Sequence, residues 1–120
     1  MSRIFKLTDA RTVEEVGISK TRWLVDRELG ATKMMAVLYE YEPNLKMNKL
    51  HYHANRESAY FILEGEAKIH LNGNEYNVGP GNFVYLSPKD IHGVVGTGNE
   101  GLKYLEFWAP LESDVVYINE

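Results

Sequence analysis

The chain has 120 residues, which is enough for one compact domain and too few for two of ordinary size. Hydrophobic residues make up 44% and charged residues 25%, a composition that argues against disorder, a collagen-like repeat and a coiled coil. The formal net charge is -4, and binding to a phosphate backbone needs a basic surface. We therefore expect no nucleic-acid partner.

The sequence contains no cysteine, which excludes disulfides, thiolate zinc sites and cysteine nucleophiles and leaves His, Asp and Glu as the strong metal ligands. Its apolar runs are all much shorter than the roughly 20 residues of a membrane span. Charged residues also interrupt positions 1–20, where a signal peptide needs an apolar core. We expect a cytoplasmic protein with no membrane partner.

Residues 1–20 are expected to form an N-terminal arm in which Thr12–Glu15 offers at most one helical turn. After Gly17 the segments are brief, rich in β-branched and aromatic residues, and bounded by Gly, Asn or Pro, which is typical of short strands in a sandwich or barrel. The predicted strands are Thr21–Leu29, Lys33–Tyr41, Lys49–His53, Ala59–Leu63, Glu66–Leu71, Asn74–Val78, Asn82–Leu86 and Leu102–Ala109. Within the tail, residues 111–120, the apolar run Val115–Ile118 is either a last strand or a segment that packs on a neighbouring subunit.

The pair Asn72-Gly73 predicts a tight hairpin, because it stands between two strand-like runs and both residue types tolerate the positive φ angles of a type I′ turn. In the first arm of this hairpin, Glu66–Leu71, apolar residues alternate with polar ones. His70 falls on the polar face, where we expect a structural role or simple exposure.

Two of the four histidines form the pattern His51-Tyr52-His53. Residues two apart in a strand point to the same side, with side-chain roots roughly 6–7 Å apart, so two imidazoles can converge on one ion. Glu57 follows four residues after His53, and His92 lies beyond a second Gly-Pro-rich turn. The alternative is that these histidines are ordinary surface or hydrogen-bonded strand residues.

Residues 42–110 resemble the cupin superfamily, whose two motifs run approximately G-x5-H-x-H-x3,4-E-x6-G and G-x5-P-x-G-x2-H-x3-N. His51 and His53 match the histidines of the first motif, Gly65 matches its closing glycine, and His92 matches the histidine of the second. The stretch Gly79–Pro88 is similar to the family's turn and strand before that last histidine. The resemblance implies a single all-β domain, a double-stranded β-helix or jelly-roll barrel, with one divalent metal ion inside it.

The sequence departs from these motifs at three places. Leu45 replaces the opening glycine of the first motif, and Gly96 replaces the asparagine of the second. Counted forward from His53 the carboxylate ligand is Glu57, but counted back from Gly65 its position falls on Ser58. We favour Glu57, because a divalent ion gains more from an anionic oxygen than from a hydroxyl, provided that a bulge absorbs the extra residue. If Ser58 faces inward instead, the site has three histidines and extra solvent.

Several aromatic residues are candidates either for a ligand cavity or for the core. They are Phe61, Phe83, Tyr85, Tyr104, Phe107 and Trp108, and core packing is the expected role for most of them. Leu102–Trp108 carries aromatic side chains on both faces, which favours packing against a second sheet or a second subunit. Related family members pair through early strands, and we expect a homodimer.

Two functions are compatible with this sequence. In the first, a metal ion bound by His51, His53, Glu57 and His92 coordinates a small organic acid, enol or sugar in a dioxygenase, decarboxylase or isomerase reaction, as across the cupins. Tyr85 and Tyr104 are candidate proton donors, and no catalytic residue is assigned. In the second, the protein binds a metal or a metabolite without catalysis, as a sensor or accessory protein. The ligand types accept Fe, Mn, Ni, Co, Cu or Zn.

Overall fold

The structure is a computed structural model that describes residues 2–112 and 114–118. In this part of the chain a short 3-10 helix, η1 (Leu7–Asp9), precedes the β-strands. The strands are β1 (Arg11–Glu15), β2 (Ser19–Val25), β3 (Met35–Tyr41), β4 (His51–His53), β5 (Glu57–Leu71), β6 (Asn74–Val78), β7 (Phe83–Leu86), β8 (His92–Ala109) and β9 (Val115–Tyr117). The predicted all-β fold is confirmed. Within the same residues, no helix is long and apolar enough to cross a membrane.

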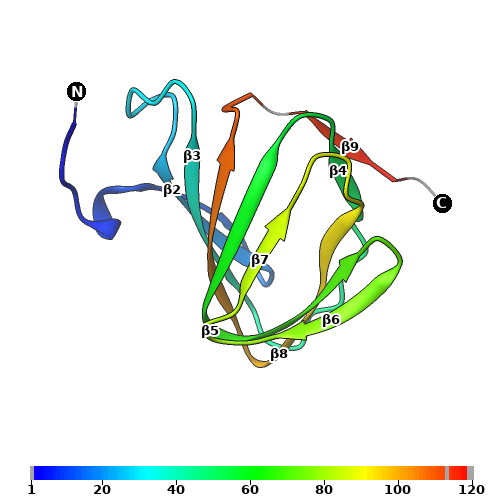
Figure 1. The fold of residues 1–120 in the computed structure, drawn as a ribbon. Helices are drawn as coiled ribbons and strands as arrows, with labels where there is room; N and C mark the ends of the chain where they lie inside the picture. Colours follow the sequence, from blue (N-terminus) through cyan, green and yellow to red (C-terminus); the bar gives the residue numbers. More distant parts are fainter. Residues whose placement is uncertain (1, 113, 119–120) are drawn as a thin grey trace.

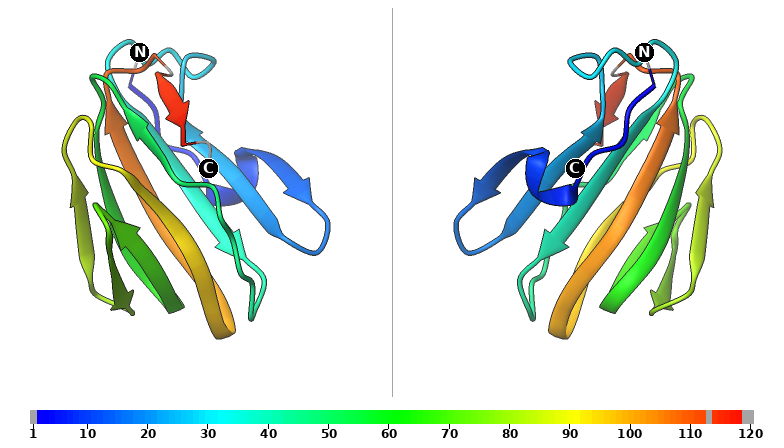
Figure 2. Two further views of the ribbon diagram at one scale, coloured as in Figure 1. Left: turned by 90° about the vertical axis from the view of Figure 1, so that its right-hand side faces the viewer. Right: turned by 90° about the vertical axis from the view of Figure 1, so that its left-hand side faces the viewer.

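The two long strands, β5 and β8, hold the fold together by pairing antiparallel along almost their whole length. The second half of β8 also pairs with β3, and its first residue pairs with β4, so β8 joins both sides of the barrel. Figures 1 and 2 show the result, with β6 and β7 on one side and β1 and β2 on the other. The described strands all pair antiparallel, in the sheet order β1-β2-β3-β8-β4-β9. β5 pairs with β8, and β6 and β7 each pair with β5.

The core lies between these layers and is built from alternate residues of the long strands. Such alternation is expected where one face of a strand is buried and the other is solvated. Its buried members are Tyr60, Ile62, Ala67, Ile69, Leu86, Leu102 and Tyr104. Tyr104 contacts two other tyrosines of this region, since it stacks on Tyr39 with ring centroids 5.1 Å apart and is tilted against Tyr60 with centroids 4.9 Å apart.

The predicted hairpin at Asn72-Gly73 is confirmed, since Leu71 pairs with Asn74 and both turn residues have positive φ. The two strands predicted at Ala59–Leu63 and Glu66–Leu71 form the single strand β5, whose register shifts on either side of Gly65. Gly65 has φ +77, and a Cβ there would collide with the Gly101 carbonyl oxygen. A glycine is therefore required at this bend, because it alone adopts positive φ without a steric cost.

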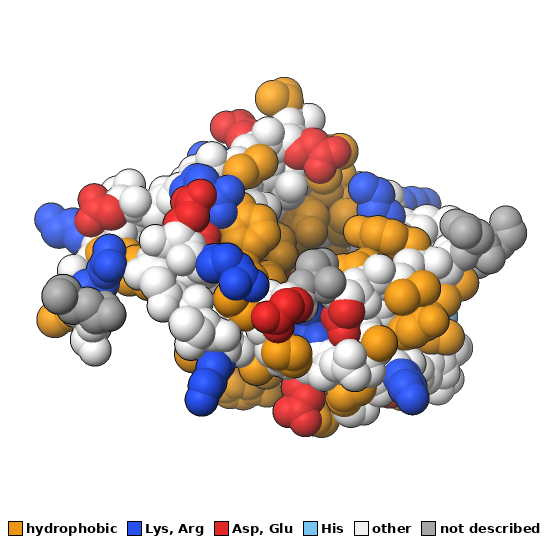
Figure 3. All heavy atoms as spheres, turned by 90° about the horizontal axis from the view of Figure 1, so that it is seen from above, with side chains coloured by type: hydrophobic (Ala, Val, Ile, Leu, Met, Phe, Trp, Pro, Cys, Tyr) orange, Lys and Arg blue, Asp and Glu red, His pale blue; other side chains and the backbone are white. Residues whose placement is uncertain are grey.

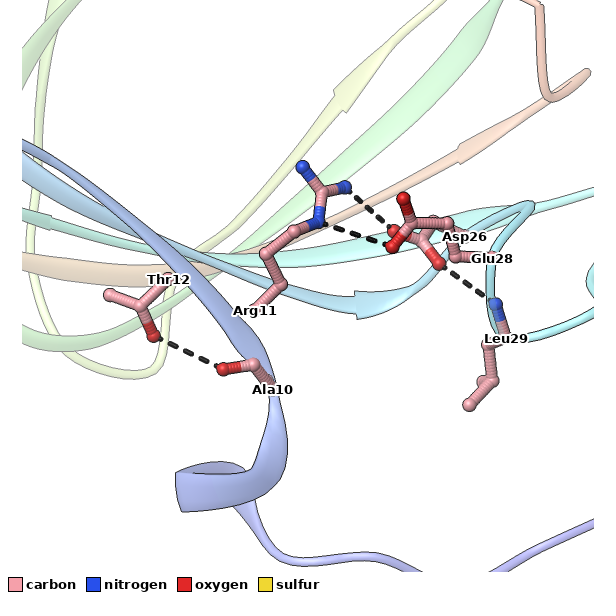
Figure 4. Close-up of polar contacts among 6 residues, drawn as sticks. All are labelled: Ala10, Arg11, Thr12, Asp26, Glu28 and Leu29. Carbon is pink, nitrogen blue, oxygen red and sulfur yellow. Dashed lines mark hydrogen bonds and ion pairs between the residues drawn. The ribbon is translucent and has the colours of Figure 1, made fainter.

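The prediction for Thr12–Glu15 was wrong, because β1 is a strand and not a helical turn. Gly17, with φ +80, allows the chain to reverse so that β1 pairs with β2. An ion pair at the start of β1 supports this hairpin, since an Arg11 Nη atom lies 3.0 Å from Asp26 Oδ2 (Figure 4). Pairing with β2 therefore outweighs the local preference of Thr12–Glu15 for a helical turn.

The first ten residues of β8 were also missed. The segment His92–Gly101 is rich in glycine, which is depleted in strands, so the local sequence gives no strand signal. Pairing with the second half of β5 nevertheless keeps it extended. At the other end of the chain, the run at Val115 forms the strand β9, which pairs with β4.

Candidate metal centre

Three histidines come together where β4 meets the start of β8. His51 pairs directly with His92 across the two strands, and His53 lies two residues along β4 on the same side. Their ring centroids are 4.3 Å apart for His51 and His92, 5.3 Å for His53 and His92, and 5.1 Å for His51 and His53. One ring nitrogen from each lies within 4.8 Å of the others, so the three side chains can share one ion.

The orientation of each ring is fixed through its Nδ1 atom. Nδ1 of His51 donates to the carbonyl oxygen of Lys49 at 2.9 Å, and Nδ1 of His92 donates to that of Asp90, also at 2.9 Å. Nδ1 of His53 lies 3.3 Å from a carboxylate oxygen of Asp114. Ligand histidines commonly bind through one nitrogen while the other is held by a carbonyl or a carboxylate. Nε2 is therefore the atom left for a ligand on all three rings.

Burial keeps these imidazoles uncharged. His53 and His92 are only 4% and 2% exposed, and burial lowers the pKa of each to about 4, with nearby Arg56 adding to the effect. Burial also lowers the pKa of His51. Nε2 of His92 is buried and has no hydrogen-bond partner among the described residues. A buried nitrogen lone pair without a partner is costly unless a ligand takes it, so the cluster fits a bound metal ion.

Glu57 does not join this cluster, contrary to the sequence-based expectation. It is exposed on the outer face of β5, where its carboxylate interacts with the exposed hydroxyl of Tyr85. Ser58 takes the inward position and is 3% exposed. Successive residues of a strand point to opposite faces, and β5 is regular where Glu57 and Ser58 pair with Ala109 and Trp108, so no bulge brings Glu57 inward. The arrangement is the three-histidine alternative stated above.

The cluster borders a cavity of about 520 Å³ inside the barrel. Tyr39, Tyr41, Tyr60 and Tyr104 form an aromatic part of its wall, and Arg56 and Glu106 are buried charged groups in the same wall. Of the aromatic residues proposed from the sequence, Tyr104 lines this cavity and Trp108 is buried, whereas Phe83, Tyr85 and Phe107 are exposed. Tyr85 is thereby separated from the cavity.

Glu106 was overlooked in the sequence although a signal was present. Leu102, Tyr104, Glu106 and Trp108 share one face of β8, so a carboxyl group stands in a row of inward-facing apolar residues. Burial raises the pKa of Glu106 to about 7, against the smaller opposing effects of Arg56 and of the Ser58 hydroxyl. Arg56 lies on the turn between β4 and β5, with its guanidinium 4.4 Å above the ring of Trp108. The cavity therefore holds one buried cation and one carboxyl group that titrates near neutrality.

The chain belongs to the cupin family, whose cupin-domain model matches residues 37–108. The oxalate-binding protein of Thermotoga maritima is 32% identical over 56 residues, which are 47% of this chain and 46% of that protein. The chain spans less than half the length of the curated relatives it matches.

Solved structures agree on the fold. The polyketide cyclase RemF from Streptomyces resistomycificus is 28% identical with a TM-score of 0.80, covering 100% of this chain and 87% of that one. A conserved double-stranded β-helix protein from Klebsiella pneumoniae covers 100% of both chains at 19% identity, with a TM-score of 0.79. The predicted double-stranded β-helix is confirmed.

Proposed function

We propose that this protein is a metal-dependent cupin that acts on a small organic acid, an enol or a sugar, with His51, His53 and His92 as the ligands of one divalent transition metal ion. The observation that carries the proposal is a group of three imidazoles, two buried and one half-buried, with donor atoms within 4.8 Å of one another, at the wall of a cavity of about 520 Å³. Cavities of this size accept small molecules.

The donor set suits Fe, Mn, Ni, Co, Cu or Zn, and such an ion supplies Lewis-acid chemistry when it is bound. The residues of the chain provide the rest of the site. Backbone carbonyls and Asp114 hold the imidazoles in one orientation. Burial raises the pKa of Tyr60 and Tyr104 well above its ordinary value, so these phenols stay protonated and act as hydrogen-bond donors. Glu106, with a pKa of about 7, can hold or release a proton near neutral pH.

The proposed reaction is of the dioxygenase, decarboxylase or isomerase type. Support for an enzyme comes from the similarity over the full chain to RemF, which is described as a polyketide cyclase. Binding without catalysis is the second candidate, and it draws support from the similarity to a protein described as oxalate-binding.

A cytoplasmic location remains part of the proposal. We also propose a homodimer, supported by exposed apolar side chains near the N-terminus, such as Ile4 and Val16.

Metal analysis of the purified protein and of three variants tests the ligand set. His51→Ala and His92→Ala are expected to lose the metal found in the wild type. His70→Ala is the matched control, because Nε2 of His70 accepts a hydrogen bond from the Gly73 amide at the hairpin and lies outside the cluster. Equal metal content in the wild type and in both cluster variants contradicts the proposal. A metal-free wild type that still binds a small ligand favours the second candidate.

A further inference from the structure

Arg56 is a buried cation that faces the cavity. The residue is 7% exposed, and its Nε atom has no hydrogen-bond partner in the described part of the chain. A cation-π contact with Trp108, 4.4 Å from the guanidinium carbon to the ring centroid, holds the guanidinium group in place. The same cavity is lined by His51 and His53, so the guanidinium of Arg56 and the histidine cluster face one space.

The protein itself compensates this charge only in part. Asp114 is 3.9 Å from Nε of Arg56, but its two oxygens also contact His53 and the amide of Asn55. Glu106, the other carboxyl group nearby, is partly protonated near neutral pH because burial raises its pKa to about 7. A buried cation that lacks a full partner is unfavourable, and an anion that enters the cavity removes this cost.

The exposed part of the cavity wall also carries more basic than acidic side chains. Lys46 and Lys49 lie at its exposed part, opposed there by Glu15. Ser58 occupies the inward position on β5 at which the family's glutamate was expected, so the three neutral imidazoles bring no charge to offset a divalent ion. The protein as a whole is acidic, with a net charge of -4, and the face in Figure 3 mixes acidic and basic side chains. Among the ionisable groups that line the cavity, the basic residues Lys46, Lys49 and Arg56 stand against Glu15 and the partly protonated Glu106.

We propose that the cavity binds a small dicarboxylate, with one carboxylate paired with Arg56 and the remainder of the molecule beside the three histidines. This inference rests on the proposed function and narrows its substrate class. An Arg guanidinium matches a carboxylate with two parallel hydrogen bonds, which a neutral amide of the same shape does not reproduce. The cavity, about 520 Å³, has room for a short diacid beside the three histidines.

Isothermal titration calorimetry with the purified wild-type protein, zinc-loaded and metal-free, tests the ligand class. The probes are malonate and succinate, each compared with its uncharged diamide. We expect at least one diacid to bind ten-fold or more tightly than its diamide to the zinc-loaded protein, and part of this preference to persist without metal because Arg56 remains charged. Equal affinities within both pairs overturn the inference, and this comparison needs no variant.

Variants test the role of Arg56. Arg56→Gln is expected to lower diacid affinity at least ten-fold, and Arg56→Lys is expected to lower it less because the charge remains. Lys33→Gln is the matched control, since Lys33 is exposed between β2 and β3 and does not line the cavity. An Arg56→Gln protein that binds diacids like the wild type overturns the inference. Metal content, measured in parallel, separates the two proposals, because loss of diacid preference with metal retained contradicts only the inference.

Discussion

Asp114, the residue that precedes β9, contacts His53 although the two residues are distant in sequence. Its Oδ1 atom lies 3.3 Å from Nδ1 of His53, while Oδ2 accepts a hydrogen bond from the Asn55 amide. Pairing between β9 and β4 sets this position, because His53 is opposite Val115, the residue after Asp114. The C-terminal strand thereby fixes a ring that the backbone of β4 alone leaves free to turn.

Asp114→Asn is expected to weaken metal binding by roughly 10-fold to 100-fold, which is typical for loss of the carboxylate that orients a ligand histidine. Competition of the purified protein with a chromophoric zinc chelator measures the change. Glu112→Gln is a suitable control, because Glu112 is exposed and its ion pair, with Arg27 at 3.7 Å, lies on the surface. An unchanged zinc affinity in Asp114→Asn shows that His53 does not depend on this contact.

Metal binding should depend little on pH between 7 and 5.5. Because burial lowers the pKa of His53 and His92 to about 4, these two rings are already neutral at pH 5.5, and burial also lowers the pKa of His51, so competition between protons and the ion is weak. Three exposed histidines with a pKa near 6.5 would each lose about 8-fold in their neutral fraction, which is roughly 600-fold in affinity over the same range. Zinc titrations at the two pH values distinguish these cases, and a steep loss below pH 6.5 would show that the rings are solvated.

Glu106 should make the protein less stable at high pH. Its pKa is raised from 4.5 to about 7, so between these values the folded protein binds more protons than the unfolded chain, and the free energy of unfolding falls as the pH rises. The contribution is fully present below pH 4.5 and is lost above pH 7. Glu106→Gln removes this dependence, and the stability of the variant relative to the wild type should rise by at most about 3 kcal/mol from pH 4 to pH 8.

Urea denaturation of both proteins at the two pH values measures this difference. The histidines contribute in the opposite direction, because their lowered pKa makes the folded protein gain stability as the pH rises from 4 to 6.5. That contribution is common to both proteins and cancels in the comparison. Glu100→Gln, at an exposed position, should follow the wild type at both pH values. A Glu106→Gln profile parallel to that of the wild type would contradict a raised pKa.

The all-β fold and the pair His51 and His53 were accessible from the sequence because they depend on short-range patterns, whereas His92 was found through its match to the second cupin motif. The hairpin at Asn72-Gly73 needs only two residues that tolerate positive φ, and the pair His51 and His53 needs only the two-residue period of a strand. Gly65 was recognised as the closing glycine of the first cupin motif, and the structure gives the physical reason, because a Cβ at this position would collide with the Gly101 carbonyl oxygen.

Other features depend on contacts between distant segments and left little local signal. β1 exists because it pairs with β2, although all of its residues are exposed. The inward position of Ser58 follows from its pairing with Trp108, which the spacing from His53 did not determine. The contact between Asp114 and His53 joins residues 61 positions apart, and a sequence pattern does not show which carboxylate folds back onto a ring.

The proposed homodimer should have twice the chain mass of 13.8 kDa in light scattering at micromolar concentration. The segment before β1 lies to one side of the barrel (Figure 1). Ile4, in this segment, and Val16, between β1 and β2, are almost completely exposed. Burial of such apolar area is the main driving force for association, so changing both residues to Asp should shift the protein towards the monomer. Tyr76→Ser, at an exposed site on the hairpin of β5 and β6, should leave the dimer unchanged. A monomeric wild type contradicts this proposal.

Glu57→Gln should leave the metal content unchanged, because the side chain points away from the three histidines and a strand offers no low-cost route to the other face. Metal analysis after dialysis, with His53→Gln as the positive control for metal loss, provides the measurement. The variant keeps the size of the side chain and removes only its charge, so folding should be preserved. Loss of the metal from Glu57→Gln would show that β5 rearranges when the ion binds, with the carboxylate turned inward in place of Ser58.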